Sequence, residues 1–140
     1  MKVLLAVDGS AYSKKMLAYL VTHRENFSEK NTFHLLNVQP ALPSRAVGAL
    51  GKAVVHDYHA EEAEKVLNPL SKFLIRHDVH ATSSWQVGHA AEQISKLAKS
   101  DDFDLVVMGS HGHSALGNLV MGSVATQVLA QCQVPVLLVR

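Results

Sequence analysis

Short apolar runs alternate with longer helical patterns along this chain, and this alternation constrains its fold more than any other feature. The runs that predict strands cover residues 2–7, 32–38, 80–87, 103–108 and 134–139. Between them, apolar residues recur at helical spacing over residues 11–24, 52–77, 90–99 and 124–131. Because strands that alternate with helices are joined by right-handed crossovers, this order predicts a parallel sheet with helices on both faces.

The predicted helices carry boundary and packing signals. Ser10 is suited to cap the first helix, and Pro69 inside the long second helix predicts a kink or a break. Residues 40–51 contain two prolines and two glycines and are expected to form a loop with the length of a lid. The residues expected to face the sheet are Met16, Leu17 and Leu20 in the first helix, and Ala63, Val66, Leu67, Leu70 and Leu74 in the second.

Length and composition limit the classes of protein that this chain can belong to. With 140 residues, 48% of them hydrophobic, it can bury a core of its own as one domain over residues 1–140. A net charge of +1 gives no electrostatic reason to expect binding to nucleic acid or to a membrane surface. The single cysteine cannot form an internal disulfide, and no apolar run has the length of a membrane span. These features predict a cytoplasmic protein that binds neither nucleic acid nor membrane.

The segment from Gly109 to Ser123 is rich in glycine and lies between a predicted strand and a predicted helix. Such a loop can hold a phosphate on backbone N–H groups at a helix start. It lacks the Gly-Lys-Ser/Thr of a Walker A motif and the glycine spacing of a dinucleotide fingerprint. Residues 105–139 contain no Asp, Glu, Lys or Arg, so rapid phosphoryl transfer is disfavoured and no catalytic residue is predicted.

The chain resembles the universal stress protein family, specifically its ATP-binding branch. That branch carries Gly-x2-Gly-x9-Gly-Ser/Thr, and Gly109, Gly112, Gly122 and Ser123 match it in spacing and identity. The flanking segments look like the family too, namely Val-Asp-Gly-Ser at 7–10, Phe-Asp-Leu-Val-Val-Met at 103–108 and Val-Pro-Val-Leu-Leu-Val-Arg at 134–140. We therefore expect a Rossmann-like α/β fold, an open, doubly wound five-stranded parallel sheet of order 3-2-1-4-5.

The resemblance also implies a site for an adenine nucleotide, ATP or AMP, with Mg²⁺ as a candidate companion. Asp8 would lie near the ribose, Val38 would contact adenine through its backbone, and the helix start at Ser123 would hold phosphate. Several nucleotide-binding members have Ser or Thr where this chain has Ala125, so one hydroxyl for the outer phosphates is missing. The predicted site consists of Ala6, Val7, Asp8, Val38, Met108, Gly109, Gly112, His113, Gly122, Ser123, Val124 and Ala125.

Plainer explanations exist for some of these features. The glycine loop can be a tight strand-to-helix connection without a ligand, and Asp8 with Ser10 can cap the first helix. Both functions of Asp8 are compatible. Residues 101–104 include three aspartates, but they precede the fourth strand, at the end of the sheet opposite the expected ligand edge. A solvated turn is the expectation there.

Nine histidines raise the question of a metal site. His56 and His59 lie three residues apart on a predicted helix, and His111 and His113 flank Gly112. No dense Cys/His cluster accompanies either pair, and zinc requires three or four ligands, so no metal site is predicted. His113 is the histidine expected to meet a phosphate.

The leading functional prediction is a small regulatory or stress-response protein that binds an adenine nucleotide. One alternative is a slow ATPase or self-phosphorylating protein, and another is a nucleotide-independent module that works through its dimer surface. The last run, from Val134 to Arg140, predicts an apolar edge strand suited to pairing with a second copy. Members of the resembled family commonly dimerise through this strand, so a homodimer is expected.

Overall fold

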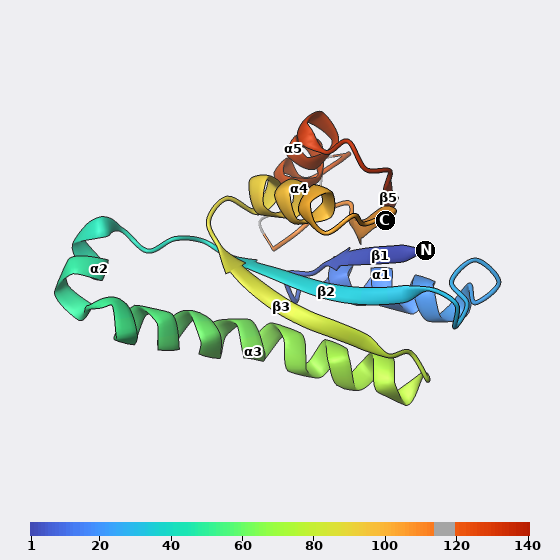
Figure 1. The fold of residues 1–140 in the computed structure, drawn as a ribbon, viewed down its shortest axis with the longest axis horizontal. Helices are drawn as coiled ribbons and strands as arrows, with labels where there is room; N and C mark the ends of the chain where they lie inside the picture. The colour runs from blue at the N-terminus through green and yellow to red at the C-terminus, as the bar shows by residue number, and fades with distance from the viewer. Residues whose placement is uncertain (114–119) are drawn as a thin grey trace.

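The computed structural model describes residues 1–113 and 120–140. Strands and helices alternate along the chain (Figure 1). The strands are β1 (Lys2–Ala6), β2 (Thr32–Gln39), β3 (Ala81–Val87), β4 (Leu105–Gly109) and β5 (Val136–Val139). The helices are α1 (Ala11–Thr22), α2 (Ser44–Leu50), α3 (Lys52–Arg76), α4 (Ala90–Ser100) and α5 (Ser123–Gln131).

The strands form one five-stranded sheet of order β3-β2-β1-β4-β5, and all neighbouring pairs are parallel. This confirms the predicted fold class and strand order. The central strand, β1, is apolar and fully buried from Val3 to Ala6, as a strand covered on both faces must be. The two edges of the sheet are β3 and β5.

Side chains of each strand alternate between two apolar cores. Val3 and Leu5 belong to the core shared with α1 and α3, whereas Leu4 and Ala6 belong to the core shared with α4 and α5. Figure 1 shows α4 and α5 above the sheet and α3 below it. The helix faces predicted from spacing are the buried ones, namely Met16, Leu17, Leu20, Ala63, Leu67, Leu70 and Leu74, with Val66 packed against them.

The long helix α3 continues through Pro69, so of the predicted kink or break, the break does not occur. Pro69 lies on the exposed side of the helix, where its ring meets solvent. Leu67 and Leu70 on either side of it are buried in the same core. Packing of this apolar stripe against the sheet therefore outweighs the roughly 3 kcal/mol that an interior proline costs a helix.

Residues 40–51, expected to be a loop, contain the seven-residue helix α2. Pro43 stands at its N-cap position, and Gly51 ends it with φ of 83°, a backbone conformation that favours glycine. No residue of α2 is buried. Figure 1 shows α2 beyond the end of the sheet, next to the start of α3. The helix therefore owes little to the core, which is why spacing of apolar residues did not reveal it.

The edge strand β3 is the least buried strand, with no fully buried residue. Its apolar contributions to the core are Ala81 and Trp85, which pack on the side of α1 and α3. The ring of His56 in α3 lies 5.2 Å from the Trp85 ring, centroid to centroid. The first half of α3 thereby packs against the carboxyl-terminal half of β3.

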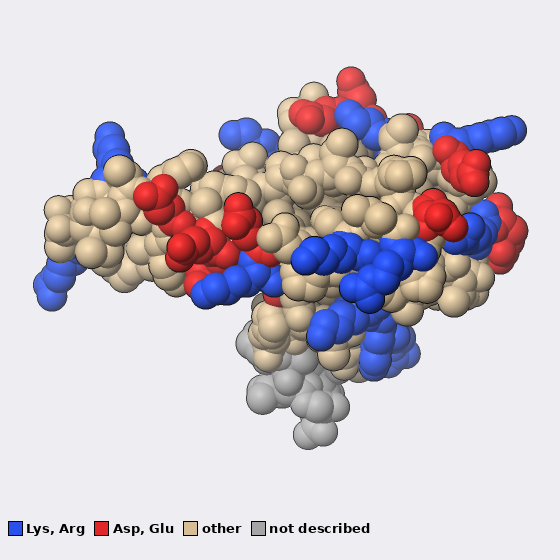
Figure 2. All heavy atoms as spheres, turned by 90° about the horizontal axis from the view of Figure 1, so that it is seen from below, with Lys and Arg blue, Asp and Glu red and all other residues tan. Residues whose placement is uncertain are grey.

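Charges of both signs share the face seen from below in Figure 2. Acidic side chains gather over the first half of α3, whose sequence carries Asp57, Glu61, Glu62 and Glu64, and lysine and arginine side chains lie beside and beyond them. The two kinds of charge thus occupy neighbouring parts of the same face. None of the helices in the described ranges 1–113 and 120–140 is long and apolar enough to cross a membrane.

Candidate functional site

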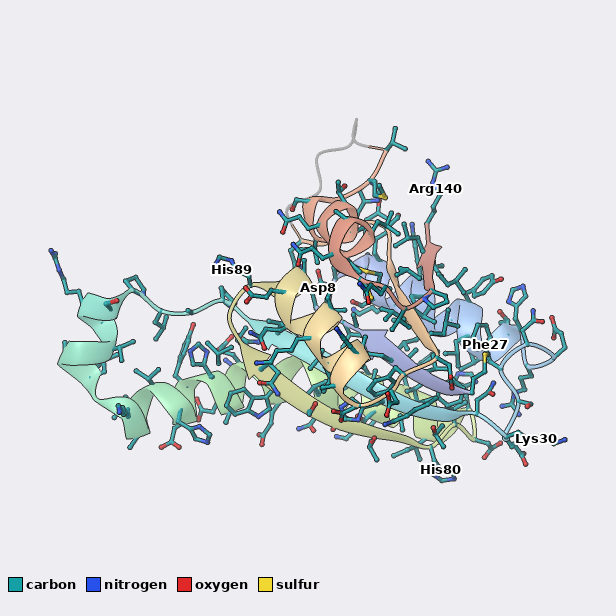
Figure 3. All side chains as sticks on the ribbon, turned by 45° about the horizontal axis from the view of Figure 1, so that its top comes forward. Asp8, Phe27, Lys30, His80, His89 and Arg140 are labelled. Carbon is teal, nitrogen blue, oxygen red and sulfur yellow. The ribbon has the colours of Figure 1, made fainter. Side chains whose placement is uncertain are left out.

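A pocket opens at the carboxyl edge of the sheet, where β1 and β4 are neighbours. The helix after β1 packs on one face and the helix after β4 on the other, so this is the switch point at which open α/β sheets bind ligands. Figure 3 shows Asp8 at this edge, whereas Phe27, Lys30 and His80 mark the opposite end of the molecule. The pocket has a volume of about 500 Å³, and small-molecule sites have roughly 300–1,000 Å³.

All the residues predicted for the nucleotide site line this pocket. They are Ala6, Val7, Asp8, Val38, Met108, Gly109, Gly112, His113, Gly122, Ser123, Val124 and Ala125. Segments that are far apart in the sequence are thus brought together at one place. His111 lines the pocket as well, and four further lining residues were not predicted, namely Ser13, Leu36, Ala90 and Ile94. Ala90 and Ile94 occupy the inward face of α4, and the same spacing that predicts a core position also places them on a pocket wall.

Asp8 is held in place by the first turn of α1. Its Oδ1 accepts hydrogen bonds from the Ser10 N–H and the Ser13 hydroxyl, both at 2.9 Å. Burial by itself raises the pKa of Asp8, but the hydrogen bonds from Ser10 and Ser13, with the His113 imidazole nearby, outweigh burial and hold that pKa below its ordinary value. Ser10 is the N-cap, and its hydroxyl accepts from the Ser13 N–H. Asp8 therefore supports the helix start and also presents a carboxylate to the pocket.

A buried asparagine in β2 fixes the backbone beside the pocket. The Asn37 side chain is 2% exposed and donates from Nδ2 to the Val7 carbonyl at 2.9 Å. Gln39 in turn donates from Nε2 to Asn37 Oδ1 at 2.6 Å. The Val7 N–H donates to the Leu36 carbonyl, so both backbone groups of Val7, directly after β1, are hydrogen-bonded to β2. A polar residue directly after the apolar pair Leu35 and Leu36 of a predicted strand was the available signal for this role.

The glycines of the loop are placed where a side chain would collide with the protein. A Cβ at Gly109 would lie 2.7 Å from the Cβ of Tyr12, and one at Gly112 would lie 2.6 Å from Oδ2 of Asp8. At Gly122 the conflict is with backbone, since a Cβ would stand 3.2 Å from the Ser110 carbonyl oxygen. The spacing of the motif therefore reflects close packing of the loop on α1 and on itself, in addition to any need for access by a ligand.

The N-terminus of α5 is directed at the pocket. Gly122 is the N-cap residue without a side-chain cap, and its own N–H donates to the Ser110 carbonyl at 2.7 Å. The first N–H to bond back within the helix is that of Thr126, which donates to Gly122. The N–H groups of the first turn, from Ser123 to Ala125, thus have the arrangement that holds anions at helix starts. The Thr126 hydroxyl also donates to the Gly122 carbonyl, as expected from its place on the helix.

Two histidines stand at the rim of the glycine loop. His113 Nε2 lies 2.6 Å from the backbone oxygen of Asp8 and thus donates to it. His111 Nδ1 lies 2.8 Å from the Ser110 hydroxyl, and its ring is 4.8 Å from the Tyr12 ring. Among the described residues that line the pocket, Asp8, His111 and His113 are the titratable ones, and there is no lysine or arginine.

Other charged groups considered in the sequence lie elsewhere. The described residues contain no group of three or more His, Cys, Asp and Glu side chains placed to share a metal ion. His56 and His59 flank Trp85. Asp104 Oδ2 accepts from the Lys2 N–H at 2.7 Å, so this aspartate belongs to the turn that pairs β4 with β1, at the end of the sheet away from the pocket.

The segment 40–51 does not cover the pocket. None of its residues lines it, and α2 lies away from it beyond the sheet. The segment has the length of a lid, and in the structure it lies apart from the pocket. The part of the glycine loop at 114–119 lies outside the described residues.

Comparison with known proteins agrees with the resemblance noted in the sequence. The model of the universal stress protein family matches residues 1–140. The universal stress protein Slr1230 of Synechocystis is 34% identical over 140 residues, covering 99% of this chain and 42% of its own length. YxiE of Bacillus subtilis is 29% identical over 145 residues, covering 99% of this chain and 98% of its own. The chain thus spans under half of the Synechocystis relative and nearly all of the Bacillus one.

Solved structures of the same fold give a consistent picture. MJ0577 of Methanocaldococcus jannaschii superposes with a TM-score of 0.80 at 25% identity, covering 99% of this chain and 94% of that one. UspA of Lactobacillus plantarum gives 0.82 at 19%, covering 100% and 97%. More distant neighbours, at 16–18% identity, were solved with cAMP, with AMP and with dAMP bound. This chain belongs to the universal stress protein family.

Proposed function

We propose that the pocket between β1 and β4 binds an adenine nucleotide, AMP or ATP. The observation that carries this proposal is the convergence of three features on one pocket at the switch point. These are an apolar wall, the carboxylate of Asp8 and the N-terminus of α5. A nucleotide presents the same three parts in order, with a flat apolar base, a ribose with hydroxyl groups and an anionic phosphate.

Each part of the nucleotide has a matching group in the pocket. Leu36, Val38 and Ile94 supply apolar surface for the base, and Asp8 can accept hydrogen bonds from ribose hydroxyls. The N–H groups at Ser123 face the phosphate, aided by the positive end of the α5 dipole. The nucleotide complexes of distant members of the same fold support adenine nucleotide as the ligand class.

We propose a regulatory role for this binding, in which the nucleotide sets the conformation or the partner of the protein. Phosphoryl transfer at a useful rate requires cationic groups or metal ions around the transferred phosphate. The described residues that line the pocket include no lysine or arginine. The pocket is thus equipped to hold a nucleotide and poorly equipped to turn it over.

The direct test is to find the nucleotide and then to measure its binding. Freshly purified protein is denatured, and any released nucleotide is identified by chromatography. The stripped protein is then titrated with AMP and ATP by calorimetry in the presence of magnesium. We expect a dissociation constant in the range of about 1–100 µM. The proposal is contradicted if the folded protein releases no nucleotide and gives no heat of binding with AMP or ATP.

A charge placed at the helix start tests the position of the phosphate. Ser123→Glu adds a carboxylate at the first residue of α5, where it suits the helix dipole but repels phosphate. We expect AMP affinity to fall about tenfold or more, because repulsion of roughly 1.4 kcal/mol between the new carboxylate and the phosphate corresponds to this factor. Gln127→Glu is the matched control, because Gln127 is exposed on the same helix and does not line the pocket. Equal affinities of the two variants would show that the phosphate lies elsewhere.

A further inference from the structure

We propose that the pocket selects adenine nucleotides by the number of their phosphates, and takes AMP in preference to ATP when no divalent cation is present. This inference rests on the proposed adenine-nucleotide site and assigns its preferred ligand class. It follows from the described residues that line the pocket, which include the carboxylate of Asp8 and no lysine or arginine.

The first observation is the absence of lysine and arginine from a long stretch of sequence that includes the glycine motif. Residues 105–139 contain no Lys or Arg, and this range includes every residue between Gly112 and Gly122. A loop of this kind can offer backbone N–H groups, hydroxyls and imidazoles to an anion. It cannot offer the fixed positive charge that normally holds the outer phosphates of a triphosphate.

The second observation is a fixed negative charge on the wall of the pocket. Asp8 lines it, and the hydrogen bonds from Ser10 and Ser13 favour the ionised carboxylate. Its Oδ2 points toward Gly112, since a Cβ built at Gly112 would lie 2.6 Å from that oxygen. A carboxylate can bind the hydroxyls of a ribose, but it repels each additional phosphate that approaches the loop.

The third observation is that the hydroxyls of α5 are few and partly engaged. Ala125 lines the pocket with a 2% exposed methyl group. The neighbouring Thr126 directs its hydroxyl to the Gly122 carbonyl at 2.9 Å and does not line the pocket. Ser123 is therefore the α5 residue that lines the pocket with a hydroxyl. The helix start suits one phosphate group and provides little for a second or a third.

The fourth observation concerns Lys15, a lysine of α1 whose ring contact leads toward the loop. Lys15 Nζ lies 4.9 Å from the centre of the Tyr12 ring, and the Tyr12 ring packs against His111. Neither Lys15 nor Tyr12 lines the pocket. The ammonium group contacts the Tyr12 ring and does not line the pocket, so it does not supply the missing cation there.

The sum of these features predicts the order of affinities. AMP carries about two negative charges near neutral pH, and each further phosphate adds about one. One phosphate can be held by the N–H groups and the dipole of α5, whereas the additional charges of ATP gain no cation and are brought nearer to Asp8. Magnesium would neutralise much of this excess charge. We therefore expect the preference for AMP to be strong without a divalent cation and weak with one.

The experiment is a series of calorimetric titrations of the stripped protein with adenosine, AMP, ADP and ATP. They are performed at about pH 8, above the ordinary titration range of imidazole, with EDTA and then with magnesium. With EDTA we expect AMP to bind at least about tenfold more tightly than ATP, and magnesium to reduce this ratio to about threefold or less. ATP binding as tightly as AMP with EDTA present would overturn the inference alone. Failure of all four ligands to bind folded protein would overturn the proposed function as well.

A pair of lysine variants tests whether the missing cation is the cause. Ser123→Lys places an ammonium group at the pocket, and Gln127→Lys adds the same charge on the exposed side of α5. With EDTA present, we expect the ratio of the ATP and AMP dissociation constants to fall by about fivefold or more in the first variant, and by less than about twofold in the second. An unchanged ratio in Ser123→Lys, with the fold intact by circular dichroism, would contradict the charge argument.

Discussion

Gly109 shows how one residue of a ligand-binding motif can be required by the protein itself. It is the last residue of β4, and α1 lies so close that a Cβ there would meet the side chain and backbone of Tyr12. Gly112 and Gly122 are likewise confined by Asp8 and by the backbone at Ser110. A motif read only for its ligand would therefore miss that the same glycines allow the loop to pack on α1.

Replacing Gly109 by alanine should destabilise the fold in the absence of any ligand. The new Cβ would stand 2.7 Å from the Tyr12 Cβ, so β4 and α1 must move apart. We expect the free energy of unfolding to fall by about 1–3 kcal/mol in urea titrations followed by circular dichroism. Gly48→Ala is the control, because a Cβ at Gly48 meets nothing within 4 Å and alanine suits a helix. Equal stabilities of the two variants would contradict the packing argument.

At the scale of secondary-structure elements, the predictions succeeded where burial was strong. The order of strands and helices was predicted, and strand ends differed by one or two residues, as for β5, which starts at Val136 instead of Val134. Two expectations failed in opposite ways. Helix α2 was missed because it buries nothing and its segment is rich in turn residues. Of the kink or break predicted at Pro69, the break is wrong, because local preference at Pro69 was given more weight than the buried stripe around it.

The candidate pocket was predictable to the extent that its residues carry a motif. Asp8 and the glycine loop were identifiable because they match segments of the universal stress protein family in residue type and spacing. Leu36 and Ile94 were not, because a pocket wall continuous with the core uses the same apolar residues as the core. Only the three-dimensional arrangement separates the two roles. What these residues bind remains the proposal given above.

Removing the proline from α3 should strengthen the helix. Pro69 has no N–H to donate to the preceding turn, and its side chain is exposed, so it contributes no core packing in return. We expect Pro69→Ala to raise the free energy of unfolding by about 1–3 kcal/mol. Leu70→Ala, one position along and buried, should lower it by about 2–5 kcal/mol. If Pro69→Ala is no more stable than the parent chain, the rest of α3 is adapted to the proline.

At the scale of the whole molecule, the two edges of the sheet differ in character. The outer strand β3 presents polar side chains such as Thr82, Ser83 and Gln86, which discourage pairing with another sheet. The other outer strand, β5, consists of Val136, Leu137, Leu138 and Val139. We propose that β5 pairs with β5 of a second copy, which would give a two-fold homodimer.

A single proline in β5 should separate such a dimer. The Pro135 carbonyl accepts from Val106 of β4, and the Val139 carbonyl accepts from Ser110, directly after β4. The alternate residues Val136 and Leu138 therefore direct their backbone groups outward. Leu138→Pro removes one outward N–H and should sediment at the 15.2 kDa of one chain, whereas the parent should sediment at twice that mass. Leu138→Ala loses the same side chain and keeps the N–H, so it should stay dimeric. A parent chain that sediments as a monomer at about 100 µM would contradict the proposed pairing.

Trp85 is the only tryptophan of the chain, and it lies at the junction of β3 with the first half of α3. Its intrinsic fluorescence therefore reports on one junction, and Trp85 is not a lining residue of the pocket. A denaturation curve recorded by Trp85 emission follows the packing of α3 against β3, whereas far-ultraviolet ellipticity follows all the helices. Coincidence of the two curves is the criterion for two-state unfolding, and only then does either midpoint describe the whole molecule.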